Sequence, residues 1–279
     1  MSFFGRNRAP RGTRRSPTPG SGANYGRQGT LSQPPSPGAG STTLGNEDGR
    51  PLYLCSPFAN SALVKGNFKT IVMLPKYVDV MEWVAVNIYD FFVNLNEFYG
   101  VLAESCTQTT CPAMSAGHNL NYLWQQTSGK FVQMTAPQYI DTVMSSIQIM
   151  LDDETIFPTN TNPYTFHAYT RSSQLVLTSS PYHPDHEFQR TFPGVSRHIY
   201  RQLLRIFAHI YHAHFHQILH LRAEPHFNSL FAHFLAFGRE FDLLEVKEIL
   251  GDPSAGPQGV MPGVGLLFEK WREMGTLEK

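Results

Sequence analysis

The chain has 279 residues, of which 41% are hydrophobic and 13% aromatic, so it can bury a full-sized core in one large or two small domains. Its zero net charge conceals an asymmetry, because residues 1–50 hold seven Arg against two acidic residues, which leaves a net charge of −5 for residues 51–279. The three cysteines are too few for a disulfide framework, and neither a signal peptide nor an apolar run of about 18 residues is present, so we expect an intracellular protein without a membrane span.

The first fifty residues differ in composition from the rest of the chain. They are rich in Gly, Pro, Ser and Arg and poor in apolar residues, so they cannot bury enough surface to offset the entropy of ordering. We predict a disordered basic tail over residues 1–50. The tail contains three dipeptides that proline-directed kinases phosphorylate and that any Pro/Ser-rich linker also contains: Ser16-Pro17, Thr18-Pro19 and Ser36-Pro37.

Ordered structure is expected from residue 51. The segment FKTIVMLP, residues 68–75, reads as an extended piece that ends at Pro75. Helical periodicity follows in four segments, residues 78–99, 136–153, 195–221 and 225–250. Because strands and helices do not alternate, we predict an all-α helical bundle over residues 51–250.

Two further segments interrupt or follow these helices. Residues 159–194 form an insert much longer than the ~2–8 residues of an ordinary helix connection, which indicates a functional loop or a disordered segment. Residues 251–279 begin as a Gly/Pro linker and end in a short amphipathic piece, LLFEKWREM, which we expect to be a C-terminal tail.

Charged residues form stripes on two of the expected helices. On the first helix, apolar positions share one side, while Asp79, Glu82, Asp90 and Glu97 line up within roughly 80° on the other, bordered by Trp83. This is either a solvated face or a docking surface. Arg197, Arg201 and Arg205 recur at four-residue intervals on a later helix, which suits phosphate binding but is also common on a solvated face.

Cysteines and histidines are clustered in two distant places. Cys106 and Cys111 lie near a turn, and the stretch AHIYHAHFHQILH, residues 208–220, holds five histidines. Two thiolates and two imidazoles would complete a tetrahedral zinc site, although buried thiols and a histidine-rich helix need no metal. Spacing alone favours the pair His212 and His216, which lie a turn apart on one helix face. On an ideal helix His209 and His214 are separated by about 140°.

Several of these segments together resemble the Mob/phocein family. The resemblance runs from about Leu52 to Ile249 and is strongest in four stretches: ALVKGNFKTIVMLPKYVDVMEWVAVNIYDFFVNLNEFYG, CPAMSAG, LDDETIFP and RIFAHIYHAHF. It implies a Mob-type helical bundle stapled by a structural zinc. The implied zinc ligands are Cys106, Cys111, His209 and His214, with His212 and His216 kept as the alternative histidine pair.

The resemblance also implies a function and two binding surfaces. Family members are non-catalytic adaptors and co-activators of NDR/LATS-type kinases, and the first segment resembles the fungal mitotic-exit members. It implies that Glu82, Trp83 and Asp90, with Asp79 in the same stripe, receive a basic segment of the kinase. Arg201 and Arg205 match positions that bind phosphothreonine peptides of an upstream kinase or scaffold, but Gln202 stands where a further basic residue often occurs.

Other classes of function fit the sequence less well. No P-loop, Gly-rich dinucleotide turn or nucleophile elbow is present, so we expect no enzyme, although a zinc hydrolase could use the same Cys/His set. A phocein-like subunit of a striatin-type phosphatase scaffold is the other alternative. We expect no nucleic-acid ligand, and a location in the cytoplasm with the nucleus, spindle pole and division site as further places.

Overall fold

The computed structural model describes residues 49–64, 67–126, 128–158, 191–252, 254 and 260–277. These residues belong to one compact unit, Ala39–Lys279. The predicted tail, with its proline-directed sites, falls on residues 1–48, and the insert falls mainly on residues 159–190; both lie outside the described residues. None of the described helices is long and apolar enough to cross a membrane.

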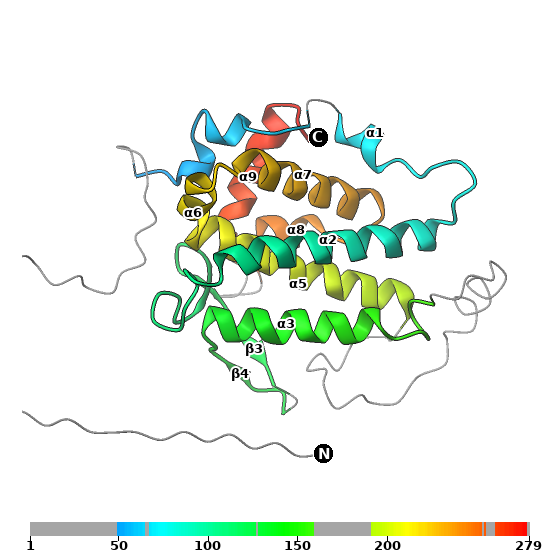
Figure 1. Ribbon diagram of the computed structural model, residues 1–279, viewed down its shortest axis with the longest axis horizontal. Helices are drawn as coiled ribbons and strands as arrows, with labels where there is room; N and C mark the ends of the chain where they lie inside the picture. Colours follow the sequence, from blue (N-terminus) through cyan, green and yellow to red (C-terminus); the bar gives the residue numbers. More distant parts are fainter. Residues whose placement is uncertain are drawn as a thin grey trace, which may run out of the picture. The chain divides into compact units, whose positions relative to one another are not determined.

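A long helix, α5 (Phe192–Ala213), runs through the core of this unit (Figure 1). Thr191 caps it by accepting a hydrogen bond from the Gly194 backbone N–H at 3.3 Å, and Pro193 occupies the first turn, where no amide partner is needed. Most of its side chains are buried, and it contacts α2, α3, α9 and the first strand. The histidine and arginine positions of this helix are therefore fixed by packing on several sides.

Two amphipathic helices flank α5. Helix α2 (Val80–Leu102) buries Val84, Ile88, Phe91 and Leu95, and α3 (Ala136–Leu151) packs beside it in the opposite direction (Figure 1). The remaining helices of the described residues are α1 (Phe68–Val72), α6 (Phe215–His220), α7 (Glu224–Glu240), α8 (Val246–Leu250) and α9 (Gly263–Glu273), with short 3-10 turns η1 (Leu52–Leu54) and η2 (Phe58–Asn60).

The described fold is mostly helical but contains two small antiparallel ribbons. Strand β1 (Met114–Gly117) pairs with β2 (Leu120–Tyr122), and β3 (Trp124–Gln125) pairs with β4 (Phe131–Val132). The all-α prediction is therefore correct only in that most of the described structure is helical. Strands of two to four residues are too short for their alternation to be recognised in the sequence.

Helix ends differ from the prediction at several places. Residues 68–72 are helical rather than extended, because Asn67 caps α1 by accepting from the Lys69 backbone N–H at 2.8 Å. Helix α2 continues past Gly100 to Leu102. The two longest predicted helices are each divided, one at His214 and the other after Glu240, where Asp242 adopts a positive φ of 53°. A residue in the left-handed conformation ends a helix even where the apolar periodicity of the sequence continues beyond it.

The C-terminal segment is part of the core, in contrast to the short tail expected over residues 251–279. Helix α9 buries Val264, Leu267, Phe268 and Trp271. The Trp271 indole Nε1 donates to the carbonyl of Ala59 at 2.9 Å, which joins the two ends of the folded body. The folded unit therefore extends to at least Leu277, itself buried.

Candidate metal centre and docking surfaces

The two candidate cysteine ligands lie in a compact loop directly after α2. The backbone N–H of Cys106 donates to the carbonyl of Leu102 at 3.0 Å, and that of Cys111 donates to Thr107 at 2.8 Å. The Thr110 hydroxyl closes the loop by donating to the Ser105 carbonyl at 2.7 Å. These local bonds fix the backbone of the loop and hold both thiols in buried positions.

The two candidate histidine ligands meet because α5 ends between them. His209 lies in the last turns of α5, whereas His214 has φ −127° and ψ 10° and separates α5 from α6. This departure from helical geometry removes the 140° separation that an ideal helix would impose. The two imidazole centroids lie 5.1 Å apart, and the Nε2 atom of each ring lies against a sulfur of the cysteine loop.

The side chains of Cys106, Cys111, His209 and His214 converge on one point. Cys106 Sγ lies 3.6 Å from His209 Nε2, and Cys111 Sγ lies 3.4 Å from His214 Nε2. All four atoms lie within 4.8 Å of one another, and all four residues are buried. A tetrahedral zinc site with ordinary bond lengths has a sulfur–nitrogen edge of about 3.5 Å. The arrangement could therefore hold a metal ion.

Neighbouring groups prepare these atoms for a metal. His209 Nδ1 lies 2.8 Å from the Ser115 carbonyl, which can only accept, so the proton is on Nδ1 and the Nε2 lone pair faces the site. The hydrogen bond from Cys106 lowers the pKa of the Cys111 thiol, and His209 and His214 lower it further against the opposing effect of burial. A thiolate is the form that binds metal.

The alternative histidine pair does not join this cluster. His216 is exposed on α6, and His212 is half-buried on α5. Burial lowers the pKa of His212, and the neighbouring His209 lowers it further. The helix break at His214 could not be recognised from spacing, which is why spacing alone favoured the other pair.

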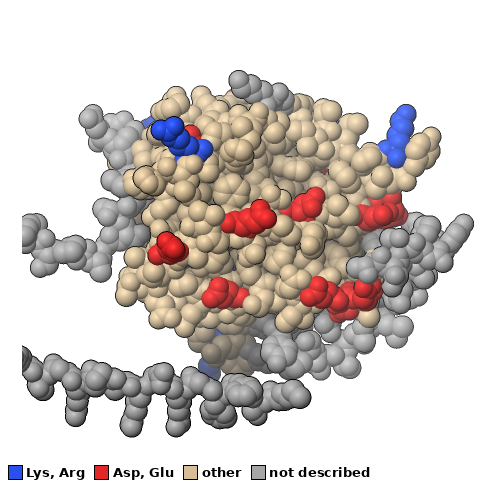
Figure 2. All heavy atoms as spheres, viewed as in Figure 1, with Lys and Arg blue, Asp and Glu red and all other residues tan. Residues whose placement is uncertain are grey.

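The acidic stripe on α2 is exposed in the structure. Glu82, Asp90 and Glu97 face solvent, and Figure 2 shows acidic side chains spread over the face formed by α2 and α3, with Lys and Arg only near its margins. Helix α3 and its C-terminal turn contribute Asp141 and Asp152 to the exposed acidic groups. The field of this face favours a positively charged partner.

Asp79 and Trp83 have structural roles at the start of the same helix. Asp79 caps α2 by accepting from the backbone N–H groups of Met81 at 2.8 Å and Glu82 at 3.3 Å. The half-buried Trp83 donates from Nε1 to the carbonyl of Val72 at 3.3 Å and packs against Phe237. Both residues fix the connection from α1 into α2, whereas Glu82, Asp90 and Glu97 are the exposed acidic residues of the stripe.

Exposed apolar side chains lie beside the start of the stripe, a feature that the sequence analysis missed. Met73, Leu74, Tyr77 and Val80 are all exposed, and Tyr77 is fully exposed with a positive φ of 67°. The hydrophobic run VMLPKYV could have indicated this surface, because Pro75 prevents it from continuing as a buried helix. Apolar residues next to charged ones are typical of protein interfaces.

The arginines of α5 are already engaged within the protein. Arg201 Nε donates to Glu248 Oε1 at 2.6 Å, and Arg205 donates to the Tyr139 hydroxyl at 2.8 Å while lying 5.2 Å from the Tyr122 ring centroid. Arg197 forms an ion pair with Asp242. Gln202 is buried and accepts a hydrogen bond from Arg205. The partners Tyr139, Asp242 and Glu248 are distant in sequence, so no local pattern indicated them.

The described residues form a mostly helical body with a buried Cys2His2 cluster that could hold a metal ion and an exposed acidic helix face. The chain belongs to the Mob1/phocein family, whose family model matches residues 60–251. It is 45% identical over 197 residues to the maintenance of ploidy protein mob2 of Schizosaccharomyces pombe, covering 71% of each chain.

Two further relatives have names that refer to a kinase. The CBK1 kinase activator protein MOB2 of Candida albicans is 44% identical over 199 residues, which cover 71% of this chain and 56% of that protein. The protein of the same name in Saccharomyces cerevisiae is 41% identical over 198 residues, covering 71% and 61%. The match therefore spans less than two thirds of the length of these two relatives.

Proposed function

We propose that this chain is a non-catalytic co-activator of an NDR/LATS-family Ser/Thr kinase and acts in mitotic exit, septation or cell polarity signalling. The observation that carries this proposal is the exposed acidic face of α2 in a chain of the Mob1/phocein family. Relatives in Candida albicans, Saccharomyces cerevisiae and Homo sapiens have names that describe kinase activators.

The acidic face would receive a basic, helical segment of the kinase. A single exposed ion pair contributes only about 0.2–1 kcal/mol, so Glu82 and Asp90 by themselves would give specificity rather than tight binding. The adjacent apolar residues Met73, Leu74 and Tyr77 supply surface that a partner could bury. Binding would order the kinase segment and thereby favour the active conformation of the kinase.

The metal of the proposed co-activator is zinc, in a structural role. Two thiolates and two imidazoles are ligands that zinc prefers, and four protein ligands leave no position for a catalytic water. The burial of all four residues supports this assignment over the alternative of a zinc hydrolase. Bound zinc would join the loop after α2 to the end of α5, two segments that are about a hundred residues apart in sequence.

A second contact, with phosphothreonine in an upstream kinase or scaffold, is proposed at Arg201 and Arg205. A guanidinium group forms strong charge-assisted bonds to phosphate. Here the phosphate must displace Glu248 from Arg201, so we expect weak binding. For the location of the protein, we propose the cytoplasm, nucleus, spindle pole and division site, where such a kinase pathway acts.

Affinity purification of the tagged full chain, followed by mass spectrometry, tests the proposal. Wild-type protein should recover an NDR/LATS-family kinase, and the double variant Glu82→Lys/Asp90→Lys should lose it. A matched control, Glu104→Lys/Glu273→Lys, reverses two exposed charges outside the proposed contact and should retain the kinase. Recovery of striatin-type phosphatase scaffolds in place of a kinase would contradict the proposed function.

A further inference from the structure

Exposed apolar side chains gather on the part of the chain that leads into α2. Seven of the seventeen exposed large apolar side chains of the described residues lie within residues 63–80. They are Leu63, Val64, Ile71, Met73, Leu74, Tyr77 and Val80. Such a concentration exceeds what the rest of the described chain shows, and exposed apolar surface of this kind is typical of a protein interface.

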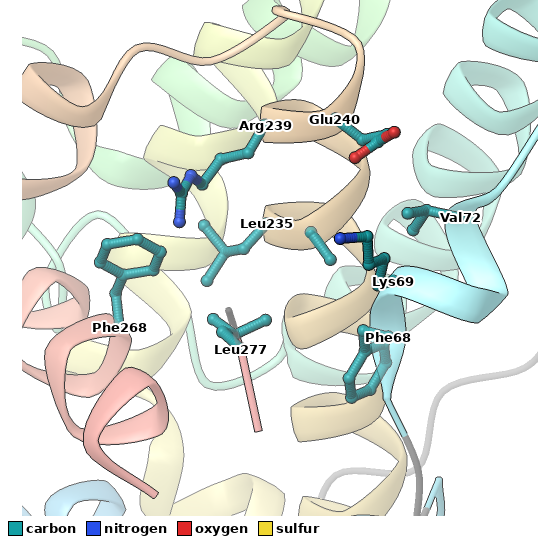
Figure 3. A pocket seen from close by; sticks show the side chains of 9 residues that line it. Phe68, Lys69, Val72, Leu235, Arg239, Glu240, Phe268 and Leu277 are labelled. Atoms are coloured by element: carbon teal, nitrogen blue, oxygen red, sulfur yellow. The ribbon is translucent and has the colours of Figure 1, made fainter. Parts of the chain in front are cut away.

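This segment is attached firmly to the core on its other side. Figure 3 shows Phe68 and Val72 of α1 beside helix α7, and both side chains are buried. Helix α1 packs directly against α7, and the Trp83 indole Nε1 donates to the carbonyl of Val72. One side of α1 is therefore fixed, whereas Ile71 is exposed. A partner would meet a surface that is already formed, which lowers the cost of ordering it on binding.

Tyr77 has a backbone conformation that is unusual for an aromatic residue. The Val78 backbone N–H donates to the carbonyl of Pro75 at 3.3 Å, and this closes a turn whose third residue, Tyr77, has a φ of 67°. Glycine is the usual residue at such a position, because a Cβ atom crowds the backbone there. The Tyr77 side chain is fully exposed, so packing in the core does not offset the strain. A residue that strains its own turn without filling the core points to a role in binding.

The charges beside Tyr77 indicate the chemistry of the partner. Glu82 lies in the first turn of α2, and Asp90 lies about 12 Å further along the same helix, at 1.5 Å per residue. Residues 73–90 contain three carboxylates and one cation, Lys76, which gives this stretch a net charge of −2. The face of an aromatic ring also attracts cations. An exposed ring beside an acidic helix therefore favours a basic partner over a neutral or an acidic one.

We propose that Tyr77 is the aromatic anchor of the kinase contact and receives an arginine of the basic kinase segment on the face of its ring. This inference rests on the proposed function and adds to it the residue on which affinity depends. A basic helix that lies along α2 over Asp90 and Glu82 would reach Tyr77 at its end. Met73 and Leu74, both exposed, would contact the aliphatic stem of the arginine. Arginine suits this place because its planar guanidinium stacks on a ring while its stem covers apolar neighbours.

Three Tyr77 variants of the full chain test the inference by surface plasmon resonance, with the kinase that the wild-type chain recovers as the probe. Tyr77→Gly removes the ring and relieves the backbone. It should raise the Kd for the kinase by at least about tenfold, while the midpoint of its urea unfolding should not fall. Tyr77→Phe keeps the ring and should stay within about threefold of the wild-type Kd. Tyr77→Leu keeps an apolar side chain without a ring face and should bind more weakly than Tyr77→Phe.

Phe131→Ala is the matched control, because Phe131 is an exposed aromatic residue on β4, outside the proposed contact, and it should bind the kinase like the wild type. A wild-type Kd in Tyr77→Gly would overturn the inference and leave the proposed function intact. A wild-type chain that recovers no NDR/LATS-family kinase would overturn both. A lower unfolding midpoint in Tyr77→Gly would show that the ring supports the fold, and equal binding of Tyr77→Leu and Tyr77→Phe would exclude an arginine on the ring. Either of these two results also overturns the inference.

Discussion

Arg201 of α5 and Glu248 of α8 form a hydrogen-bonded ion pair with an Nε to Oε1 distance of 2.6 Å, across 47 positions of sequence. The second carboxylate oxygen of Glu248 accepts the backbone N–H of Glu245 at 2.9 Å, as part of the capping box of α8. The carboxylate is therefore held in place from both sides. Glu248 thus binds the guanidinium group of Arg201, the group that the resemblance implies binds a phosphate.

Removing the negative charge of Glu248 should strengthen phosphopeptide binding. We expect Glu248→Gln to bind a phosphothreonine peptide about three- to tenfold more tightly than the wild type, because Arg201 no longer has a competing anion. Calorimetric titration with phosphorylated and unphosphorylated peptides measures the effect, and Lys247→Gln on the same helix is the control. Equal affinity for the two peptides in every variant would show that the arginines only stabilise the fold.

Gln202→Arg tests whether the missing basic residue can be restored. The sequence suggests that a third cation would tighten phosphate binding, but Gln202 is buried and hydrogen-bonded to Arg205. A second guanidinium in this place would be desolvated beside an existing one, so we expect a loss of about 2–4 kcal/mol in the free energy of unfolding. Urea denaturation measures it. An unchanged free energy of unfolding would mean that the new side chain reaches solvent.

The four candidate metal ligands allow a prediction about the metal content of the protein and the stability of its fold. Purified protein should contain one equivalent of zinc. Cys106→Ser or His209→Ala should lower the metal content. The same variants should lower the free energy of unfolding by at least about 3 kcal/mol, because metal binding is coupled to folding. Elemental analysis and denaturant titration give the two values. His212→Ala and His216→Ala are the controls and should leave both unchanged; metal loss in these variants alone would move the site to the other histidine pair.

The ligand assignment shows what sequence could and could not predict. Two cysteines and a histidine cluster indicated a site, and the resemblance selected His209 and His214. Helical spacing placed His209 and His214 on different sides of one continuous helix. The periodicity of α5 continues smoothly into α6 and conceals the break at His214. The break is visible only in the backbone angles of His214, since no Gly or Pro in residues 208–220 marks it in the sequence.

The fold was predictable where apolar periodicity was long. Helices α2, α3 and α7 were found because their buried faces repeat over several turns. Helix α1 was missed because five residues rich in β-branched side chains read as a strand, and only the Asn67 cap distinguishes them. Helix α9 was taken for a tail because the Gly/Pro segment before it resembles a linker, although Phe268 and Trp271 lie in the core.

The kinase contact should depend on salt concentration. An acidic face that meets a basic helix gains from long-range attraction, which is screened beyond about 8 Å at physiological ionic strength. We expect the apparent Kd for the partner kinase to rise by about tenfold between 50 mM and 500 mM NaCl, and the double variant Glu82→Lys/Asp90→Lys to lose this dependence. Surface plasmon resonance across a salt series measures both. A Kd that does not change with salt would leave the apolar residues beside Tyr77 as the main contact.

Helix α9 gives the sharpest test of where the folded unit ends. Trp271 is buried, its indole Nε1 donates to the Ala59 carbonyl, and its ring packs on Phe231. Trp271→Ala should therefore lower the free energy of unfolding by about 3–5 kcal/mol, from the cavity and the unpaired carbonyl together. Trp271→Phe keeps most of the volume but not the hydrogen bond, so it should lose less. Met274→Ala, at an exposed position directly after α9, is the control and should change the value by under about 0.5 kcal/mol. A Trp271→Ala protein that unfolds like the wild type would mean that residues 51–250 form the stable unit without α9.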